Sequence, residues 1–331
     1  MHTESSRPSA PEELPEASSG HQPVLCAETL QALQVAPDGI YVDATFGRGG
    51  HARLILQHLG RTGRLYALDR DLEAERAARS LCDGRFTMIR ERFSQVRRVC
   101  AALGILGRVQ GLLLDIGVST PQLSDPGRGF SFRSHGPLDM RMDQGQEHDA
   151  ARLVNGCTAE ELERIFREYG EERYAARVAR AIARSRELRP ITTTSELCAI
   201  VERTVPHDPH ARKHRATRVF QALRIAVNHE LEELQAALEA CPEVLAPGGV
   251  LAVISFHSLE DRMVKHFMRR GAEQPVLPPG LPLTQTQIRE RCGARIFEAV
   301  RSPVRPGAQE LAANPRARSA VLRSAVRAAE G

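Results

Sequence analysis

The stretch D-A-T-F-G-R-G-G-H, residues 43–51, links a short apolar run to an amphipathic one and so predicts a glycine-rich turn from a β-strand into a helix. In an open α/β sheet, such a turn lies at the carboxyl edge of the strands, where these folds bind ligands. Gly47, Gly49 and Gly50 let the backbone pass close to a ligand, and the helix N-terminus offers unpaired N–H groups to a carboxylate. The spacing is not G-x-G-x-x-G, which favours a smaller nucleoside-bearing ligand over a nicotinamide dinucleotide, although a tight turn without a ligand fits the same pattern.

Outward from this turn, apolar runs alternate with amphipathic stretches, which predicts β-α units and a mostly parallel sheet. The expected strands are residues 40–44, 64–69, 86–90, 109–115 and 249–256, and the helices between the first four are residues 51–59, 72–80 and 94–103. Residues 294–301 and 318–326 are expected to close the edge of the sheet as a hairpin.

The alternation stops after Asp115, where a loop rich in Gly, Pro, Asp and Ser runs to about Asp143. Charged helical segments follow near residues 159–169, 171–188 and 193–205, and one long helix is expected over residues 217–241. This pattern indicates a helical insertion within an α/β core. The expected division is a disordered tail at 1–20, a core in two parts at 21–118 and 226–331, and an insert at 119–225.

Composition is typical of a globular protein without a membrane segment. Of the 331 residues, 42% are hydrophobic and 26% charged, and no uncharged apolar run approaches the roughly 20 residues that span a bilayer. The seven cysteines form no C-x-x-C pair and are expected to be reduced thiols, and the Ser-, Pro- and Glu-rich tail lacks the apolar region of a secretory signal. We therefore expect a cytoplasmic location. From Arg262 onward, thirteen basic residues stand against five acidic ones, which favours a polyanionic partner.

The ends of the second and third strands carry candidate ligand contacts. Asp69 ends the second strand, where a carboxylate can accept hydrogen bonds from ribose hydroxyls. Asp71 is better placed as the N-cap of the following helix. Phe93 could cover an adenine ring or could be an ordinary core aromatic.

The fourth strand leads into Asp115-Ile-Gly-Val-Ser-Thr-Pro-Gln122, a carboxylate followed by a turn with hydroxyl and amide groups. Group transfer to an exocyclic base amine needs an acceptor that orients the N–H groups, and Asp115 could supply it. The alternative is a strand-end aspartate that caps a turn.

The glycine-rich turn, the strand-two Asp and the strand-four Asp, in that order, resemble the class I (Rossmann-like) S-adenosylmethionine-dependent methyltransferases. Nine collinear strings between His21 and about Arg327 make the chain similar, more specifically, to the RsmH (MraW) family. The strings are D-A-T-F-G-R-G-G-H (43–51), A-L-D-R-D (67–71), L-L-D-I-G-V-S-T-P-Q-L (113–123), R-G-F-S-F (128–132), G-P-L-D-M-R-M-D (136–143), Y-G-E-E-R (169–173), F-Q-A-L-R-I-A-V-N (220–228), I-S-F-H-S-L-E-D-R (254–262) and N-P-R-A-R-S (314–319).

The resemblance implies an α/β class I methyltransferase core with an inserted helical substrate-recognition domain. It implies methyl transfer from S-adenosyl-L-methionine to the N4 amine of a decoding-site cytidine in bacterial 16S rRNA, within the small ribosomal subunit or a late assembly intermediate. The family's cofactor contacts fall on Gly49, Gly50, His51, Asp69, Phe93, Asp115 and Gln122. Catalysis is expected at Asp115 and at His257, which follows the fifth strand, and no essential metal is expected. The oligomeric state is left open.

Two features near the expected site allow more than one interpretation. Ser258 and Asp261 could cap a helix rather than act in the cleft. The N/D-P-P-Y/F box of many amino-methyltransferases is replaced here by Asp115-Ile-Gly-Val, so the aromatic that stacks the target base must come from elsewhere, with Phe130 and Phe132 as candidates.

The loop at residues 207–214 has three histidines that superficially resemble metal ligands, but its proline, its cations and the lack of a cysteine partner in the sequence favour a solvated loop. Its basic residues, and those near residue 317, are instead expected to contact RNA phosphates. The candidates are Arg212, Lys213, Arg215, Arg218, Arg316 and Arg318.

Two other functions compete with methylation of 16S rRNA. The chain could be a cofactor-binding assembly factor that docks on ribosomal RNA without turnover, although intact Asp115 and Gln122 argue against this. It could also be a methyltransferase of similar fold that acts on DNA or protein.

Overall fold

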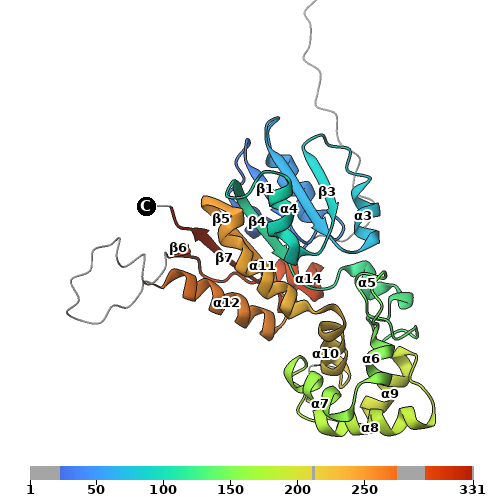
Figure 1. Ribbon diagram of the computed structural model, residues 1–331. Coiled ribbons are helices and arrows are strands. Elements are labelled where there is room, and N and C mark those ends of the chain that lie inside the picture. Colours follow the sequence, from blue (N-terminus) through green and yellow to red (C-terminus); the bar gives the residue numbers. More distant parts are fainter. Residues whose placement is uncertain (1–22, 211–212, 274–294, 330–331) are drawn as a thin grey trace, which may run out of the picture.

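The computed structural model describes residues 23–210, 213–273 and 295–329, and it consists of a twisted sheet flanked by helices with a helical region beyond one end of it (Figure 1). The expected tail at 1–20 and the candidate Arg212 lie outside the described residues. The strands are β1 (Ile40–Asp43), β2 (Arg64–Asp69), β3 (Phe86–Arg90), β4 (Val109–Asp115), β5 (Leu245–Ser255), β6 (Phe297–Val300) and β7 (Val321–Arg327).

The seven strands form one sheet in the order β3-β2-β1-β4-β5-β7-β6. Strands β1 to β5 are parallel to one another, and β7 runs antiparallel to both β5 and β6. The predicted α/β, Rossmann-like fold with an edge hairpin is therefore confirmed. Because the chain leaves β1 toward β2 and β3 but returns to β4 on its other side, the direction of strand order reverses next to β1, where such sheets bind ligands.

Helices cover both faces of the sheet. One face carries α1 (Cys26–Leu33), α2 (Gly50–His58) and α3 (Leu72–Ala78), whose apolar residues share a core with Leu65, Leu113 and Ile254. The other face carries α4 (Val96–Ala102), α11 (Glu230–Val244) and α12 (Ser258–Ala272), packed on Leu112, Leu251 and Val253. Burial on both faces explains why the central strands are continuous apolar runs. None of the described helices combines the length and apolar content that a membrane crossing requires.

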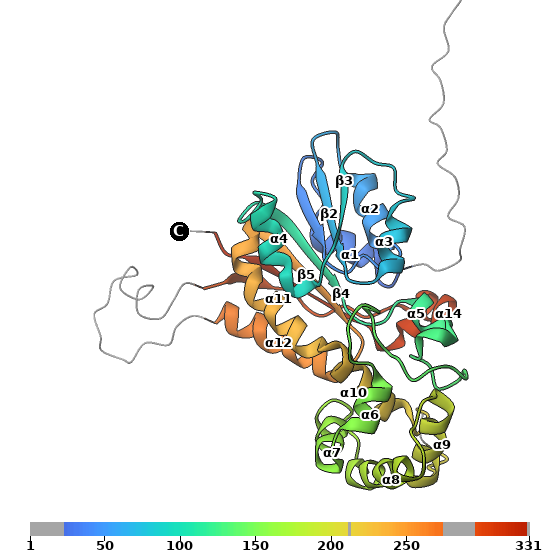
Figure 2. The ribbon, with the colours of Figure 1, turned by 45° about the vertical axis from the view of Figure 1, so that its right-hand side comes forward.

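A helical region follows β4 and lies beyond the carboxyl ends of the strands (Figure 2). It contains α5 (Thr120–Ser124), α6 (Ala150–Gly156), α7 (Ala159–Glu168), α8 (Ala175–Leu188), α9 (Thr194–Thr204) and α10 (Thr217–Asn228). These helices have a hydrophobic core of their own, which includes Leu162, Phe166, Val178 and Leu197. The limits 119–225 for the insert stay a prediction.

The expected long helix over residues 217–241 is wrong, because α10 ends at Asn228 and α11 begins at Glu230. His229 between them has a φ of 51°, a left-handed conformation that ends the first helix and turns the chain into the second. The last short elements are the 3₁₀ turns η1 (Phe93–Gln95), η2 (Pro126–Arg128) and η3 (Pro315–Ser319), and the helix α14 (Ala308–Ala313).

Candidate active site

The carboxyl ends of β1, β2 and β4 place Asp43, Asp69 and Asp115 at one edge of the sheet, and the sequence predicted strand-end positions for Asp69 and Asp115. Asp69 ties the glycine-rich turn to β2, since its Oδ2 accepts the backbone N–H of Gly47 at 2.8 Å and its Oδ1 accepts that of Asp71 at 2.9 Å. Burial raises the pKa of Asp69. Each of its oxygens keeps a further lone pair, so the carboxylate can still accept hydrogen bonds from a ligand.

Gly49 and Gly50 are required by packing as well as by any ligand. Gly49, the N-cap of α2, has a φ of 76°, and a Cβ there would lie 2.6 Å from the ring of Phe46. A Cβ at Gly50 would lie 2.4 Å from the ring of Pro23. A side chain at either position would therefore displace the turn itself.

His51, on the first turn of α2, lies beside the carboxylate of Asp115. The two side chains are 6% and 25% exposed, and Nε2 of His51 is 3.5 Å from Oδ2 of Asp115, without the geometry of a hydrogen bond. Burial lowers the pKa of His51, but Asp115 and then Asp43 raise it by more, so the net shift is upward. The imidazole and the candidate catalytic carboxylate are thus electrostatically linked.

Asp115 itself is held by its backbone, which donates to Oγ1 of Thr45 at 2.6 Å. Its Oδ1 is buried and has no hydrogen-bond partner among the described residues. A buried, unpartnered carboxylate oxygen is costly, and it is the kind of acceptor that a bound amine or hydroxyl would satisfy.

Asp43 is a member of this acidic edge that sequence reasoning did not single out, although it begins the string that defines the glycine-rich turn. It is 1% exposed, and its Oδ1 accepts the backbone N–H of Thr45 at 3.2 Å. Burial raises the pKa of Asp43 to about 6, against the opposing effect of His51.

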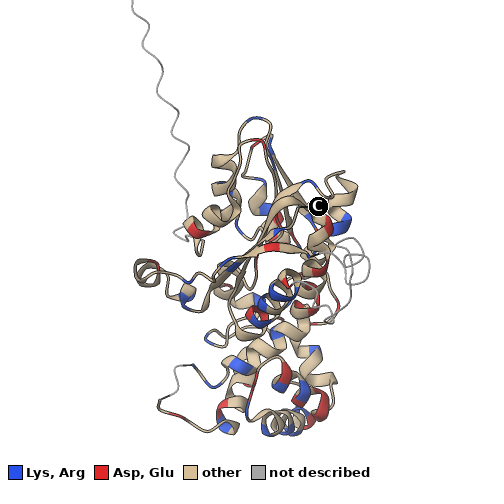
Figure 3. Ribbon diagram, turned by 90° about the vertical axis from the view of Figure 1, so that its left-hand side faces the viewer, with Lys and Arg blue, Asp and Glu red and all other residues tan. Residues whose placement is uncertain are grey.

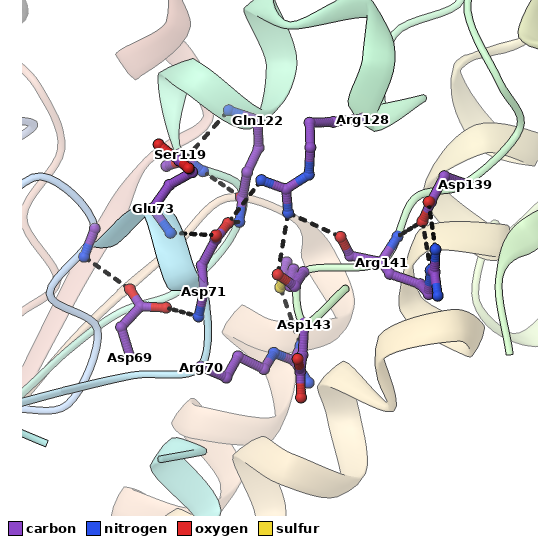
Figure 4. A network of polar contacts seen from close by, with 12 residues as sticks. Asp69, Arg70, Asp71, Glu73, Ser119, Gln122, Arg128, Asp139, Arg141 and Asp143 are labelled. Atoms are coloured by element: carbon purple, nitrogen blue, oxygen red, sulfur yellow. Dashed lines mark hydrogen bonds and ion pairs between the residues drawn. The ribbon is translucent and has the colours of Figure 1, made fainter. Parts of the chain in front are cut away.

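A second polar cluster joins the end of β2 to the loop after β4 (Figure 4). Asp71 caps α3 by accepting the backbone N–H of Glu73 at 2.9 Å, which confirms its predicted capping role. Its other oxygen accepts from Nε2 of Gln122 at 2.7 Å and lies 3.0 Å from Nη1 of Arg128. Gln122 also closes a capping box with Ser119 at the start of α5. The structure therefore places Gln122 on Asp71, and its proposed contact with the cofactor stays a prediction.

Arg70 is a further residue that sequence reasoning missed. Its side chain is buried and donates to the backbone carbonyl of Asn228 at 3.1 Å and to the sulfur of Met142 at 3.0 Å. Asn228 accepts the backbone N–H of Met142 at 2.8 Å and donates to the carbonyl of Met140 at 2.7 Å. The only sequence signal for these contacts was their presence in the strings A-L-D-R-D, G-P-L-D-M-R-M-D and F-Q-A-L-R-I-A-V-N.

The aromatic candidates lie in packed positions. Phe93 begins η1 and is partly buried against the core under α4 and α11. Phe130 is only 6% exposed, and the ring of Phe132 stacks on that of His214 with 4.7 Å between centroids. Phe130 belongs to the helical region's own core and Phe132 is half-buried against it, and stacking of the target base by either ring stays a prediction.

The residues after β5 form the start of α12, and a catalytic role for His257 stays a prediction. His257 is the N-cap, Nε2 lies 3.0 Å from Oε1 of Glu260, and Oε2 of Glu260 accepts the backbone N–H of Phe256. The proposed cap by Ser258 and Asp261 is wrong, because Ser258 donates to Glu171 and Asp261 pairs with Arg323. Burial raises the pKa of Glu260, but His257 and Arg224 lower it by more.

Two groups of side chains have the spacing of metal ligands, and each contains a competing contact. Cys198, Glu202 and His214 lie together, so the fold supplies the cysteine that the sequence around His214 lacked. Nδ1 of His214 accepts the backbone N–H of Ala216, which leaves the proton on Nε2, 3.0 Å from Glu202.

The second group is Glu230, His257 and Glu260, which are buried or half-buried. Arg224 already donates to both carboxylate oxygens of Glu230, each at 2.7 Å. Glu230 is therefore already paired with a cation, whereas both ring nitrogens of His257 and Oε1 of Glu260 have no hydrogen-bond partner among the described residues.

The RNA candidates fall into two kinds. Arg215 donates to the carbonyls of Glu202 and Val205, and Arg218 donates to the carbonyl of Glu171, so both help to hold the helical region together. The side chains of Lys213, Arg316 and Arg318 are exposed.

The chain is similar in sequence to a known family of methylases over most of its length. The model of the MraW methylase family matches residues 18–328. The chain is 50% identical over 308 residues to Ribosomal RNA small subunit methyltransferase H of Nitrosospira multiformis, which covers 93% of this chain and 97% of the relative.

Two solved structures illustrate the more distant likenesses. A putative rRNA-methylase from Clostridium thermocellum is 12% identical with a TM-score of 0.41, over 95% of this chain and 100% of the other. NSun6 from Pyrococcus horikoshii is 14% identical with a TM-score of 0.41, over 97% and 57%.

Proposed function

This chain belongs to the MraW methylase family, and on that premise we propose that it methylates the N4 amine of a decoding-site cytidine in bacterial 16S rRNA. Its methyl donor is S-adenosyl-L-methionine. The relative from Nitrosospira multiformis, which shares half of its residues with this chain, is a methyltransferase of small-subunit ribosomal RNA, and this supports the RNA substrate.

The residues at the sheet edge fit S-adenosyl-L-methionine, which when bound supplies an electrophilic methyl group on a positively charged sulfur. Asp69 offers lone pairs for the ribose hydroxyls, the turn at Gly49 and Gly50 leads into the N-terminus of α2, and Phe93 lies after β3 for the adenine. Unpartnered Oδ1 of Asp115 and its neighbour Asp43 give the edge a negative charge that suits a cationic ligand.

Asp115 is the residue that we propose to orient the target amine. The N4 amine forms a bond to the methyl carbon as the sulfur–carbon bond breaks, and it must lose one proton. A carboxylate oxygen with a free lone pair can hold an N4 hydrogen, align the nitrogen and receive that proton or pass it to water. His51 Nε2 lies 3.5 Å from Oδ2 of Asp115, so Oδ1 is the oxygen left for the amine. Because cytosine's amine is conjugated to its ring, positioning carries much of the acceleration.

The RNA is held, in this proposal, by phosphate contacts from exposed cations. Lys213, Arg316 and Arg318 are the described candidates, and their contribution should weaken as salt rises, while cofactor affinity should change little. Since His257 is engaged with Glu260, we propose that it positions α12 at the site.

One genetic experiment tests the substrate, and one kinetic experiment tests the chemistry. Mass mapping of the methyl group on 16S rRNA from a deletion strain, with and without the complementing gene, should show one N4-methylcytidine that is lost and restored. If the methyl group maps to another base, or to DNA or protein, the proposed substrate is wrong and the methylated molecule takes its place.

For the chemistry, Asp115→Asn keeps the size and one acceptor oxygen but removes the charge. Single-turnover transfer at saturating cofactor and RNA should slow by about 10²–10⁴-fold, with smaller changes in binding. Transfer at the wild-type rate would show that the charge of Asp115 has no catalytic role.

A further inference from the structure

Helix α8 presents a row of arginines to solvent at the end of the helical region farthest from the sheet (Figure 1). Arg177, Arg180 and Arg184 are all exposed and stand at positions i, i+3 and i+7, which places them on one face of the helix. They span about 10 Å along its axis, at about 1.5 Å per residue.

The charges of these arginines are uncompensated. Among the described residues, no carboxylate pairs with the guanidinium group of Arg177, Arg180 or Arg184, and no hydrogen bond engages one. Neighbouring arginines on the same helical region behave differently, since Arg167 pairs with Glu163 and Arg189 with Glu196. Figure 3 shows basic and acidic residues interspersed over much of the molecule, the usual pattern of a solvated surface.

The row continues onto α9 across a groove between the two helices. Arg184 and Arg203 both line this groove, one from each helix. Its other lining residues are small, apolar or hydroxylated: Ala181, Ser185, Leu188, Ile200 and Thr204. Leu188 is 89% exposed, an unusual state for a leucine that no described partner covers. The groove thus combines two cations with apolar surface.

An aromatic ring lies at the other end of the row. The guanidinium of Arg177 is 5.7 Å from the centre of the Tyr174 ring, and that of Arg173 is 6.0 Å from it. Tyr174 is half-buried against the core of the helical region, and its ring holds the guanidinium groups beside it by cation–π contacts.

We propose that Arg177, Arg180, Arg184 and Arg203, here called the α8 arginine face, bind the phosphate backbone of ribosomal RNA at a place remote from the methylated nucleotide. The proposal rests on the proposed function, because it assumes that the substrate is RNA. RNA is favoured over an acidic protein because the relative that is 50% identical is named as a methyltransferase of small-subunit ribosomal RNA, and guanidinium groups bind phosphate oxygens with two hydrogen bonds each. Since α8 lies far from the sheet edge, this contact would supply affinity and orientation without touching the reacting atoms (Figure 2).

The test replaces Arg177, Arg180 and Arg184 together by alanine, which has a high helix propensity and should leave α8 folded. The matched control replaces three exposed arginines that lie outside the helical region, in the part of the chain that forms the sheet and its flanking helices. They are Arg61, Arg79 and Arg108, and their replacement removes the same charge from another surface. Binding to labelled, protein-free 16S rRNA is measured by filter retention over a range of salt concentrations. Methyl transfer is measured on unmethylated small subunits from a deletion strain.

The α8 variant should bind 16S rRNA about tenfold more weakly at moderate salt, and its log–log salt slope should fall by about 2–3. Its KM for small subunits should rise with kcat and cofactor affinity unchanged, while the control stays near wild type. Unchanged affinity and slope, or an equal loss in the control, would overturn the proposal. Weakened transfer on subunits with normal binding to protein-free RNA would also overturn it and would point to a protein partner.

Failure of the proposed function gives a different result. If the wild-type chain binds 16S rRNA through the α8 arginine face but methylates another base, the RNA contact stands and the assignment of cytidine N4 falls. If the wild-type chain binds neither protein-free 16S rRNA nor small subunits, both fall.

Discussion

At the scale of single residues, Asp69 combines a structural and a proposed ligand-binding role, because its carboxylate accepts two backbone N–H groups and is our candidate for the ribose. Asp69→Ala should weaken the binding of S-adenosyl-L-methionine by about 1–3 kcal/mol, about five- to 150-fold, the scale of a lost charged hydrogen bond. It should also lower the free energy of unfolding by about 1–3 kcal/mol, because the N–H groups of Gly47 and Asp71 lose their acceptor.

Calorimetric titration and urea unfolding separate these two losses. Asp38→Ala, at an exposed aspartate, is the control and should change neither. A folded Asp69→Ala variant with wild-type affinity would remove Asp69 from the cofactor site.

Asp43 makes stability depend on pH. Its pKa is raised by burial from 3.8 to about 6, so the folded state binds more protons than the unfolded state between these values. The contribution of Asp43 to the free energy of unfolding is therefore fully present below about pH 4 and is lost as pH rises through about 6. A shift of about two pKa units corresponds to a loss of about 3 kcal/mol. The raised pKa of His51 has the same sign and extends the loss toward neutral pH.

Asp43→Asn should therefore be more stable than wild type at pH 7.5, with the difference vanishing near pH 4. Urea unfolding at several pH values measures this. A difference that does not change with pH would show that Asp43 has an ordinary pKa.

At the scale of elements, the break between α10 and α11 depends on one residue in a left-handed conformation. His229 has a φ of 51°, which costs a residue with a side chain about 1–2 kcal/mol and glycine far less. His229→Gly should be as stable as wild type or more stable by up to about 1 kcal/mol, whereas His229→Val should be destabilised by more than about 1 kcal/mol. Thermal unfolding of both variants is the measurement, and equal stability of the Gly and Val variants would contradict the assigned conformation.

The strands were far more predictable than this break. Each of the first four strands is a short, mainly apolar run that ends at a charged residue. The apolar run and the charged residue mark the same strand end, and β2, β3 and β4 have the predicted limits. The pattern from Thr217 to Cys241 has neither glycine nor an early proline, and its apolar spacing continues through His229. The helix break is set by the packing of α10 and α11 on different cores, which local spacing does not encode.

The candidate site shows the same limit. Asp69, Asp115 and the glycine turn stand at strand ends and could be found from position alone. The contacts of Arg70 with Asn228 and of Asp71 with Arg128 join residues far apart in sequence, and only the tertiary fold reveals them.

At the scale of the whole molecule, the ion pair of Asp71 with Arg128 attaches the loop after β4 to the sheet. Both side chains are less than a tenth exposed and their atoms are 3.0 Å apart. Asp71→Asn leaves the guanidinium of Arg128 without its charge partner and should lower the free energy of unfolding by about 3–5 kcal/mol.

The double variant Asp71→Asn with Arg128→Met should recover part of that loss, because no unpaired charge then remains buried. Calorimetric unfolding of the wild type, the two single variants and the double variant gives the coupling energy. Additive losses would mean that the two side chains do not interact.

The position of the helical region within the chain also has a consequence for synthesis. Strand β5 pairs with β4, yet everything from Ile116 to Val244 lies between them in sequence. A ribosome making this protein therefore releases β4 long before its neighbour exists, and the edge of β4 is meanwhile a strand with unpaired N–H and C=O groups that invites aggregation. The helical region has its own core and mostly local contacts, so it can fold first during that interval. Once folded, the helical region would lie at the carboxyl end of β4. Its bulk and polar surface would then limit access to the open edge of β4 until β5 has been synthesised and pairs with it.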